Sequence, residues 1–293
     1  VYAEDLIQQH ILQYIGAQTA ETPFFMWLTY TLPHAELVVP SDSIYQQYQH
    51  LPKRPYKGHD YSGITDKPFG WAGYMSQPDT YGTYAAMVSR LDWYVGQIRK
   101  ALKAKGLEDD TIIIFASDNG AHREGGADPK FFNSSAGLRG IKRDLYEGGI
   151  RTPYIVYWKD KVKAGSVSDH VGAFWDMMPT FAEITGQKLA TTPHQVSFLP
   201  TLLGKKQKEH KYLYWEFHEE GGKQAVRYKH WKGVRLNVNK DKEVPIELYD
   251  LRTDPAEQHN LAEQYPKIVK KMKKIMSEAH TRSDLFPFQW ERK

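Results

Sequence analysis

The sequence predicts an α/β protein whose C-terminal end forms a smaller antiparallel β-plus-helix region. Two short apolar runs, 24–30 and 111–115, lack polar alternation, which is typical of strands covered on both faces. Residues 82–102 have the apolar spacing of an amphipathic helix. After residue 205, short strand-like runs separated by Gly, Asn and Lys turns indicate an antiparallel meander. We therefore predict one α/β region over 1–205 and a small subdomain over 206–293.

The remaining elements follow from local patterns along the chain. Residues 3–18 have the spacing of an amphipathic helix with Leu6, Ile7, His10, Ile11, Tyr14 and Ile15 on one face. The segment 35–80 has little periodicity and is expected to be an irregular insertion. The 111–115 strand is expected to be parallel, and 152–158 to be another buried strand. Asp176 is expected to cap a helix that ends at Gly186, and a last helix is expected over 266–280.

Composition excludes several classes of protein. The 293 residues include no cysteine, 41% hydrophobic and 13% aromatic residues, so a substantial core can form and disorder is excluded. The formal charge of +4 is small for this length and indicates no nucleic-acid partner. No run approaches about 18 apolar residues, so no membrane span is expected. Disulfides and cysteine-based metal sites are impossible.

Polar residues follow two of the predicted strands. In open α/β sheets ligands bind beyond the carboxyl ends of the strands, where His34 and the pair Asp118–Asn119 lie. A carboxylate beside a carboxamide offers the hard oxygen ligands that Ca²⁺ or Mg²⁺ prefers, although Asp-Asn-Gly is also a common turn sequence. Lys142, in a glycine-rich segment, could contact an oxyanion or simply be a solvated loop lysine.

Together these segments resemble a known family. The strings PFFMWLTYTLPHAEL, TIIIFASDNGAH, GLRGIKRDLYEGGIRTP, DHVGAFWDMMPTFAEITG and ELYDLRTDPAEQHNLAEQYP are similar to type I, formylglycine-dependent sulfatases of the alkaline phosphatase superfamily. The resemblance implies an alkaline-phosphatase-like mixed sheet flanked by helices, here incomplete. It implies that Asp118 and Asn119 bind one Ca²⁺ ion and that Lys142 binds a sulfate oxygen. It also places His34 near the bridging ester oxygen, where it would assist the leaving group.

The sequence also departs from the family. The family's formylglycine comes from a Cys/Ser-x-Pro-x-Arg motif that precedes these segments, together with a paired Asp-Asp for the metal, and neither is found ahead of these segments in the 293 residues. The nearest pattern, Ser76 to Thr80, lacks the arginine and follows His34, so we interpret it as a chance match. We therefore expect a sulfatase that lacks about its first third, with no activity by itself and weak or no Ca²⁺ binding. The missing part is expected to carry a signal peptide for a periplasmic or secreted enzyme.

The expected substrate is a sulfated glycan of the galactose or N-acetylgalactosamine type, because WEFHEEGGKQAVR is similar to bacterial polysaccharide sulfatases. Aromatic faces stack on sugars, and carboxylates and imidazoles bind hydroxyls. The candidate substrate-binding residues are His122, Arg123, His170, Trp215, Glu216 and His218. Trp215 and Phe217 could equally be strand residues that pack on one face.

Two alternative functions stay open. A phosphodiesterase or phosphonate hydrolase of the same superfamily would share the sheet, but it often holds two metals with additional histidine ligands, a pattern that we do not find. A non-catalytic module that binds sulfated glycan would have an incomplete site by nature. For a sulfatase that lacks its first third, the uncovered sheet edge is expected to favour association or a dimer.

Overall fold

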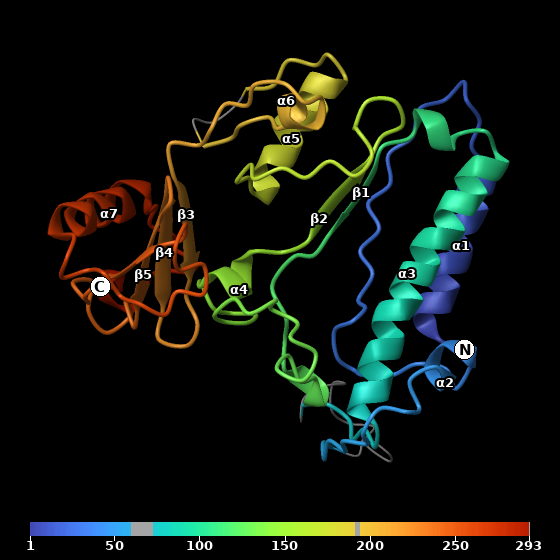
Figure 1. Cartoon of the computed structure of the whole chain (residues 1–293), viewed down its shortest axis with the longest axis horizontal. Helices are drawn as coiled ribbons and strands as arrows, with labels where there is room; N and C mark the ends of the chain where they lie inside the picture. The colour runs from blue at the N-terminus through green and yellow to red at the C-terminus, as the bar shows by residue number, and fades with distance from the viewer. Residues whose placement is uncertain (60–72, 191–193, 293) are drawn as a thin grey trace. The chain divides into compact units, whose positions relative to one another are not determined.

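The structure is a computed structural model that describes residues 1–59, 73–190 and 194–292. It comprises two compact units (Figure 1). Unit 1 contains Val1–Ile112 and His122–Phe132, and unit 2 contains Ile113–Ala121 and Asn133–Lys293. Among the described residues, no helix is both long enough and apolar enough to cross a membrane.

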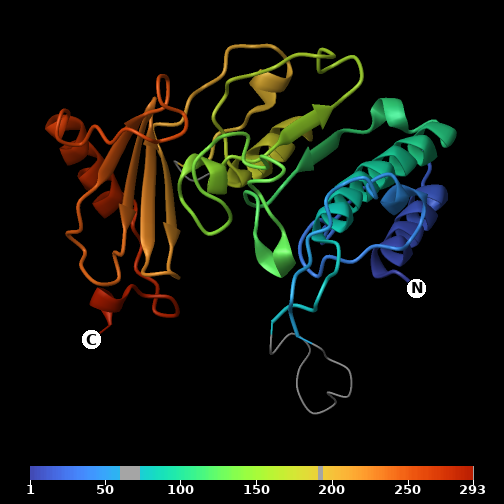
Figure 2. The ribbon, with the colours of Figure 1, turned by 60° about the horizontal axis from the view of Figure 1, so that its bottom comes forward.

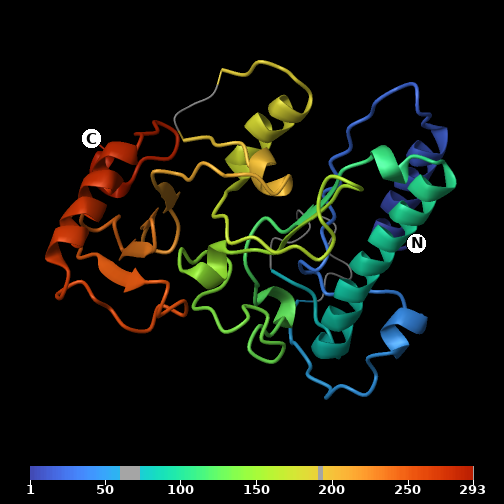
Figure 3. The ribbon, with the colours of Figure 1, turned by 45° about the horizontal axis from the view of Figure 1, so that its top comes forward.

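Unit 1 is built on two helices that lie side by side, α1 (Ala3–Ala17) and α3 (Thr80–Ala104) (Figures 1 and 3). A one-turn helix, α2 (Ser43–Gln46), and two 3₁₀ turns, η1 (Glu108–Asp110) and η2 (Glu124–Gly126), complete its helical elements. Asp79 accepts a hydrogen bond from the Gly82 amide and so caps α3. The core of the unit contains Leu32, Leu37, Met87, Tyr94 and Ala127. Both long helices confirm the sequence prediction.

The buried face of α1 differs from the predicted face. Ile11 and Ile15 are buried as expected, but Leu6, Ile7 and Tyr14 are more than two-fifths exposed. Glu4 and Gln8 are buried instead. The Gln8 amide donates to the Tyr94 carbonyl oxygen at 3.2 Å, which satisfies a polar group that hydrophobicity alone would place in water.

The predicted strand over 24–30 is wrong, because the structure assigns no strand to these residues. The expectation that both faces are covered is also wrong. Phe25 and Trp27 are 69% and 81% exposed, whereas Phe24, Met26 and Leu28 are half-buried. A strand requires a neighbouring chain that completes its backbone hydrogen bonds, and none pairs with 24–30 in the described parts of the chain. Within the irregular segment 35–80, residues 60–72 lie outside the described residues.

Unit 2 begins with a two-stranded ribbon of β1 (Ile113–Ala116) and β2 (Tyr154–Tyr157). The strands are antiparallel, with Ile114 opposite Val156, so the predicted parallel arrangement is wrong. A parallel pair requires a crossover, usually through a helix, but the helical elements of the connection are the short turn η2 and the four-residue helix α4 (Glu147–Ile150). The predicted burial of the second strand is also wrong, since Ile155 is 62% exposed.

Short helices follow β2. They are η3 (Phe174–Asp176), α5 (Met177–Ile184) and α6 (Leu199–Leu202). Asp176 lies at the start of α5 as predicted, but its side chain does not cap that helix. The carboxylate accepts hydrogen bonds from the Ala173 and Val196 amides at 2.9 Å and contacts His210 at 2.8 Å. Asp176 therefore joins three segments of unit 2.

The C-terminal meander confirms the sequence prediction (Figure 2). Its antiparallel strands, in spatial order, are β3 (Leu213–Phe217), β4 (Lys223–Tyr228), β5 (Trp231–Leu236) and β6 (Glu247–Asp250). Helix α7 (Pro266–Ala279) and the turn η4 (Gln289–Glu291) follow. These strands and α7 lie after residue 206, and the division at 205/206 stays a prediction.

The meander is covered on both faces. Val226 and Leu248 on one face pack against Met272, Ile275 and Met276 of α7. Because side chains alternate along a strand, Ala225, Val234 and Tyr249 point to the opposite face, where they pack against Leu145 and Tyr146. The segment around α4 is therefore part of the core of the meander. We call this the loop-side face of the sheet.

Candidate active site

The turn after β1 packs directly against the glycine-rich segment 139–149. The Gly120 amide donates to the Gly149 carbonyl oxygen at 2.9 Å, and the Lys142 amide donates to the Ala121 carbonyl oxygen at 2.7 Å. A Cβ atom on Gly120 would lie 1.9 Å from the Gly148 carbonyl oxygen, so only glycine allows this approach. The backbone at 118–121 and the backbone at Lys142 are thus held against each other within unit 2.

The side chains on these two segments carry the predicted chemistry. Asp118 is exposed and Asn119 is half-buried, with its side-chain amide donating to the Gly120 carbonyl oxygen at 2.9 Å. Lys142 is half-buried. Asp118 and Asn119 offer the oxygen ligands that suit Ca²⁺, but they supply fewer than the roughly six to eight that the ion takes. Throughout the described ranges, no group of three or more His, Asp or Glu side chains could hold a metal.

A buried set of charged residues anchors the 139–149 segment to the sheet. The Lys232 ammonium of β5 contacts a Glu147 carboxylate oxygen at 2.8 Å, and Arg227 of β4 lies 3.5 Å from the other oxygen. Glu257 accepts a hydrogen bond from the Glu147 amide at 2.6 Å, and its second oxygen is 3.7 Å from Lys232. Burial opposes ionisation of Glu147, but Lys232 and then Arg227 outweigh it and lower the pKa of Glu147. For Glu257 burial dominates and raises the pKa to about 7.

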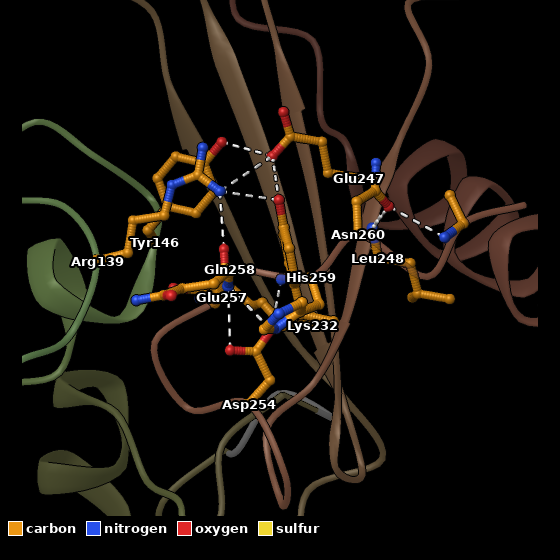
Figure 4. Close-up of polar contacts among 12 residues, drawn as sticks. Arg139, Tyr146, Lys232, Glu247, Leu248, Asp254, Glu257, Gln258, His259 and Asn260 are labelled. Atoms are coloured by element: carbon orange, nitrogen blue, oxygen red, sulfur yellow. Dashed lines mark hydrogen bonds and ion pairs between the residues drawn. The ribbon is translucent and has the colours of Figure 1, made fainter.

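Arg139 extends this anchor (Figure 4). Its guanidinium donates to the Tyr249 hydroxyl at 2.9 Å and to the Glu257 carbonyl oxygen at 2.8 Å, and it stacks 3.9 Å above the Tyr146 ring. The Tyr146 and Tyr249 hydroxyls both donate to one oxygen of Glu247, at 2.5 and 2.7 Å. A cavity of about 560 Å³ lies beside Arg139 and Glu257. The segment that carries Lys142 is therefore fixed by β5, β6 and the turn after β6.

Unit 1 holds His34 in a separate cluster. The His34 Nδ1 atom is 2.6 Å from the Ala35 carbonyl oxygen, so Nδ1 carries a hydrogen and donates. Its Nε2 atom lies 3.5 Å from Glu124, whose same oxygen is 3.3 Å from Nδ1 of His122. The two imidazole rings stack with centroids 5.3 Å apart.

The neighbours of His34 were only partly found from the sequence. His122 is buried, accepts from the Glu124 amide at Nδ1 and contacts the Pro33 carbonyl oxygen through Nε2 at 2.9 Å. Arg123 is exposed. Glu124 was missed, and the spacing His-x-Glu directly after the Asp-Asn-Gly turn is the signal that could have found it.

The other predicted substrate-binding residues lie in unit 2 and make internal contacts. Trp215 packs on the loop-side face with the Lys232 ammonium 5.7 Å from its ring, and Phe217 packs there too. Glu216 contacts His280 at 2.5 Å and His218 at 3.3 Å. Their role at the substrate stays a prediction.

His170 is half-buried, and its Nε2 atom has no hydrogen-bond partner in the described part of the chain. Burial, and then the neighbouring His210, lower the pKa of His170. Its contact with substrate is also still a prediction.

The predicted site residues thus fall into two groups. Asp118, Asn119 and Lys142 belong to adjoining backbone segments of unit 2, and His34 belongs to the histidine–glutamate cluster of unit 1. The predicted convergence of His34 with Lys142 stays a prediction.

Comparison with known proteins connects these groups to one family. The sulfatase family model matches residues 2–187, and the model of the N-sulphoglucosamine sulphohydrolase C-terminal region matches residues 140–282. An N-acetylgalactosamine-6-O-sulfatase of Bacteroides thetaiotaomicron is 30% identical over 223 residues, which cover 69% of this chain and 42% of that protein. An ulvan-active sulfatase of Formosa agariphila is 27% identical over 296 residues, which cover 88% of this chain and 52% of that protein. The chain spans about half or less of the length of these relatives.

Solved structures agree on the fold. The crystal structure of Ps i-CgsB has a TM-score of 0.73 at 24% identity, with 95% of this chain and 55% of that chain covered. A second crystal structure of that protein holds a neocarrahexaose, with a TM-score of 0.71, 24% identity and the same coverage. The fold is therefore the alkaline-phosphatase-like α/β fold with a small antiparallel C-terminal sheet. Since the sulfatase family model matches residues 2–187, which is more than half of the chain, and the fold agrees, the chain belongs to the sulfatase family.

Proposed function

We propose that this chain is the C-terminal part of a sulfatase that removes sulfate from a glycan of the galactose or N-acetylgalactosamine type. The observation that carries the proposal is the pair of backbone hydrogen bonds that join the residues after the Asp118–Asn119 turn to the 139–149 segment, from Gly120 to Gly149 and from Lys142 to Ala121. It places oxygen ligands and a cation on adjoining segments, as an anionic ester bound to a metal would require. The names of the relatives, one an N-acetylgalactosamine-6-O-sulfatase and one an ulvan-active sulfatase, support the glycan class.

In this mechanism Asp118 and Asn119 contribute ligands to one Ca²⁺ ion. A bound divalent cation would polarise a sulfate oxygen. The Lys142 ammonium binds a second oxygen and offsets the negative charge that grows in the transition state. Because the Ala35 carbonyl oxygen accepts from Nδ1 of His34, Nε2 is the atom that would face the leaving oxygen, and it would give up a proton only when the ring is protonated on both nitrogens; the Glu124 carboxylate lies on the Nε2 side of the ring.

We further propose that residues 1–293 alone have no sulfatase activity and bind Ca²⁺ weakly. The only partial match to the nucleophile motif has structural roles, which supports this view. The Ser76 hydroxyl accepts from the Gly58 amide at 3.0 Å, and Asp79 caps α3 and contacts the Lys53 ammonium at 2.5 Å. Among the residues that the structure describes, neither side chain has the neighbours of an activated nucleophile.

The decisive experiment compares residues 1–293 with the longer gene product that includes the upstream segment. Both are assayed with sulfated galactose and N-acetylgalactosamine oligosaccharides, and with matched phosphodiester and phosphonate substrates. We expect sulfate release from the longer product only, and its loss in Lys142→Ala but not in the exposed control Lys130→Ala. Faster phosphodiester cleavage would support the phosphodiesterase alternative. Tight binding of sulfated oligosaccharide without hydrolysis would support the glycan-binding module.

We also propose that the enzyme acts in the periplasm or outside the cell. The ulvan-active relative supports a polysaccharide substrate, which an enzyme outside the cytoplasm can reach without uptake. Fractionation of the native cells with an antibody against this chain tests the proposal, and signal confined to the cytoplasm would contradict it.

Association through unit 1 is a further part of the proposal. The exposed side chains of Phe25 and Trp27 lie two residues apart on a segment to which the structure assigns no strand, and exposed apolar side chains of this kind favour association. We expect residues 1–293 to form dimers or larger species in light scattering, and the double change Phe25→Ser and Trp27→Ser to shift them toward monomer.

A further inference from the structure

The loop-side face of the meander carries two cations directly opposite each other. Arg227 of β4 and Lys232 of β5 are cross-strand partners, and the side chain of Lys232 is fully buried. Like charges in such positions repel, and a buried ammonium without a counterion is costly. The carboxylate of Glu147 contacts both cations, at 2.8 Å from Lys232 and 3.5 Å from Arg227. These two cations of the sheet require an anion between them, and the Glu147 carboxylate of the 139–149 segment is that anion.

A second carboxylate completes the arrangement. Glu257, also fully buried, accepts a hydrogen bond from the Glu147 amide with one oxygen. Its other oxygen faces Lys232 (Figure 4). Its backbone has a φ of 53°, an uncommon conformation for a residue with a side chain. The backbone and the side chain of Glu147 are therefore both held by residues of β4, β5 and the turn after β6.

Glu147 is followed directly by the two glycines that contact the candidate site. The Gly148 amide donates to the Arg139 carbonyl oxygen at 2.7 Å, and the Gly149 carbonyl oxygen accepts from Gly120. A Cβ atom on Gly148 would lie 2.3 Å from the Gly140 carbonyl oxygen, so there is no spare room between these segments. A displacement of residues 147–149 must therefore displace Gly120, and with it the adjoining Asp118–Asn119 turn.

We propose that Lys232, Glu147 and Glu257 are positioning residues, through which the C-terminal sheet sets the placement of the Asp118–Asn119 turn against Lys142. In the contacts described above, the three positioning residues do not touch the side chains of Asp118, Asn119 or Lys142. They act through the backbone at 147–149. The consequence for catalysis rests on the proposed function, whereas the positioning itself does not. The small C-terminal sheet is thus part of the active-site scaffold.

The test measures amide hydrogen exchange in residues 1–293. In Lys232→Met we expect exchange at Gly120 and Lys142 to rise at least tenfold relative to the amides of β4 and β5. The matched control is Arg235→Met, which removes a buried cation of the same strand on the opposite face, where Arg235 contacts Gln224 and the Lys242 carbonyl oxygen. The control is expected to change exchange at Gly120 and Lys142 no more than in the sheet.

Glu147→Gln is the second variant, in case Lys232→Met does not fold. It keeps the side-chain volume while removing the charge between Arg227 and Lys232, and the same local rise is expected. Equal exchange changes in Arg235→Met and the two test variants, or protection at Gly120 and Lys142 that persists in both, would overturn the proposal.

Activity of the longer gene product gives an independent readout. If the proposed function holds, Lys232→Met lowers kcat more than it raises KM, because misplaced groups stabilise the transition state less. If Lys232→Met raises amide exchange at Gly120 but the longer wild-type gene product shows no sulfatase activity, the proposed function is refuted and the positioning role is retained. The two claims can therefore fail separately.

Discussion

Two segments of unit 2 are attached to the C-terminal meander by charged side chains. One attachment depends on a lysine and the other on a histidine. The 139–149 segment depends on Lys232, which is fully buried against Glu147. The C-terminal segment depends on His280, which lies on the path to η4 and contacts Glu216 at 2.5 Å and Glu291 at 2.9 Å. A lysine stays charged across the physiological pH range, whereas a histidine changes its charge near neutrality. The comparison indicates that the first attachment is the stronger one, with Glu257 as its titrating group, and that the second is weaker and titrates through His280.

The two attachments also differ in what surrounds the charges. Gly148 and Gly149 allow backbone contacts that a Cβ atom would prevent in the first segment. In the second segment aromatic rings provide the packing, and the His218 ring stacks on Phe288 with centroids 4.1 Å apart. The first arrangement fixes a backbone position, while the second mainly covers apolar surface.

The largest effect is expected from Lys232→Met. The change leaves Glu147 buried with Arg227 as its remaining close cation, and the loss of one partner from a buried ion pair costs about 3–5 kcal/mol. Urea unfolding measures the change in unfolding free energy. Lys274→Met, at an exposed pair with Glu278, is the control and should cost less than about 0.5 kcal/mol. A loss below about 1 kcal/mol for Lys232→Met would remove the contrast between the two attachments.

A smaller loss is expected from Gly148→Ala. The added methyl would lie 2.3 Å from the Gly140 and 2.6 Å from the Arg139 carbonyl oxygens, and overpacking of this kind costs about 1–3 kcal/mol. Thermal unfolding measures this loss of stability. Gly96→Ala in α3 is the control, because no heavy atom lies within 4 Å of its new Cβ, and it should instead stabilise the helix by about 0.5–1 kcal/mol. Equal effects at the two glycines would show that the 139–149 segment has room to move.

The smallest effect, and the one that depends on pH, is expected from His280→Gln. Burial lowers the pKa of His280, but hydrogen bonds to Glu291 and Glu216 outweigh burial and raise the pKa above 6.5. Because the folded-state pKa is raised, this stabilisation is fully present below the unfolded-state pKa and is lost as pH rises through the folded-state value. We expect the unfolding free energy of the wild type to exceed that of the variant by about 1–2 kcal/mol at pH 5.5 and by less at pH 8.5.

The difference between wild type and variant must be taken at each pH. The pKa of Glu257 is also raised, to about 7, so the stability of both proteins falls as pH rises between its unfolded and folded pKa values. Subtraction at each pH removes this shared effect. A wild-type advantage that grows with pH would contradict the assigned role of His280.

Local patterns were reliable where an element could be completed by its own neighbours in sequence. The strands of the meander pair in chain order, and α7 covers them with Met272 and Ile275, so alternation and helical spacing suffice to predict them. Residues 24–30 show the limit of such patterns. Their aromatic run is typical of a buried strand, yet strand formation requires a paired neighbour, which the run itself does not specify.

The residue types of the candidate site could be predicted from the sequence. The residues that hold the site in place could not. Asp118, Asn119 and Lys142 stand out by motif, and the structure brings their backbones together. Lys232 and Glu257 resemble ordinary surface charges in the sequence. Their burial follows from strand register and from the packing of α4 onto the loop-side face, which no local pattern contains.

By itself, the sequence determined the class of fold, the helices α3 and α7, the meander and the residue types of the candidate site, because periodicity and short motifs are local properties. Only the tertiary structure decided which charges are buried, that β1 and β2 run antiparallel, and that Glu147 meets Lys232 and Glu257. These features depend on contacts between residues about 40 to 110 positions apart, and the free energy of such contacts depends on how neighbouring segments exclude water.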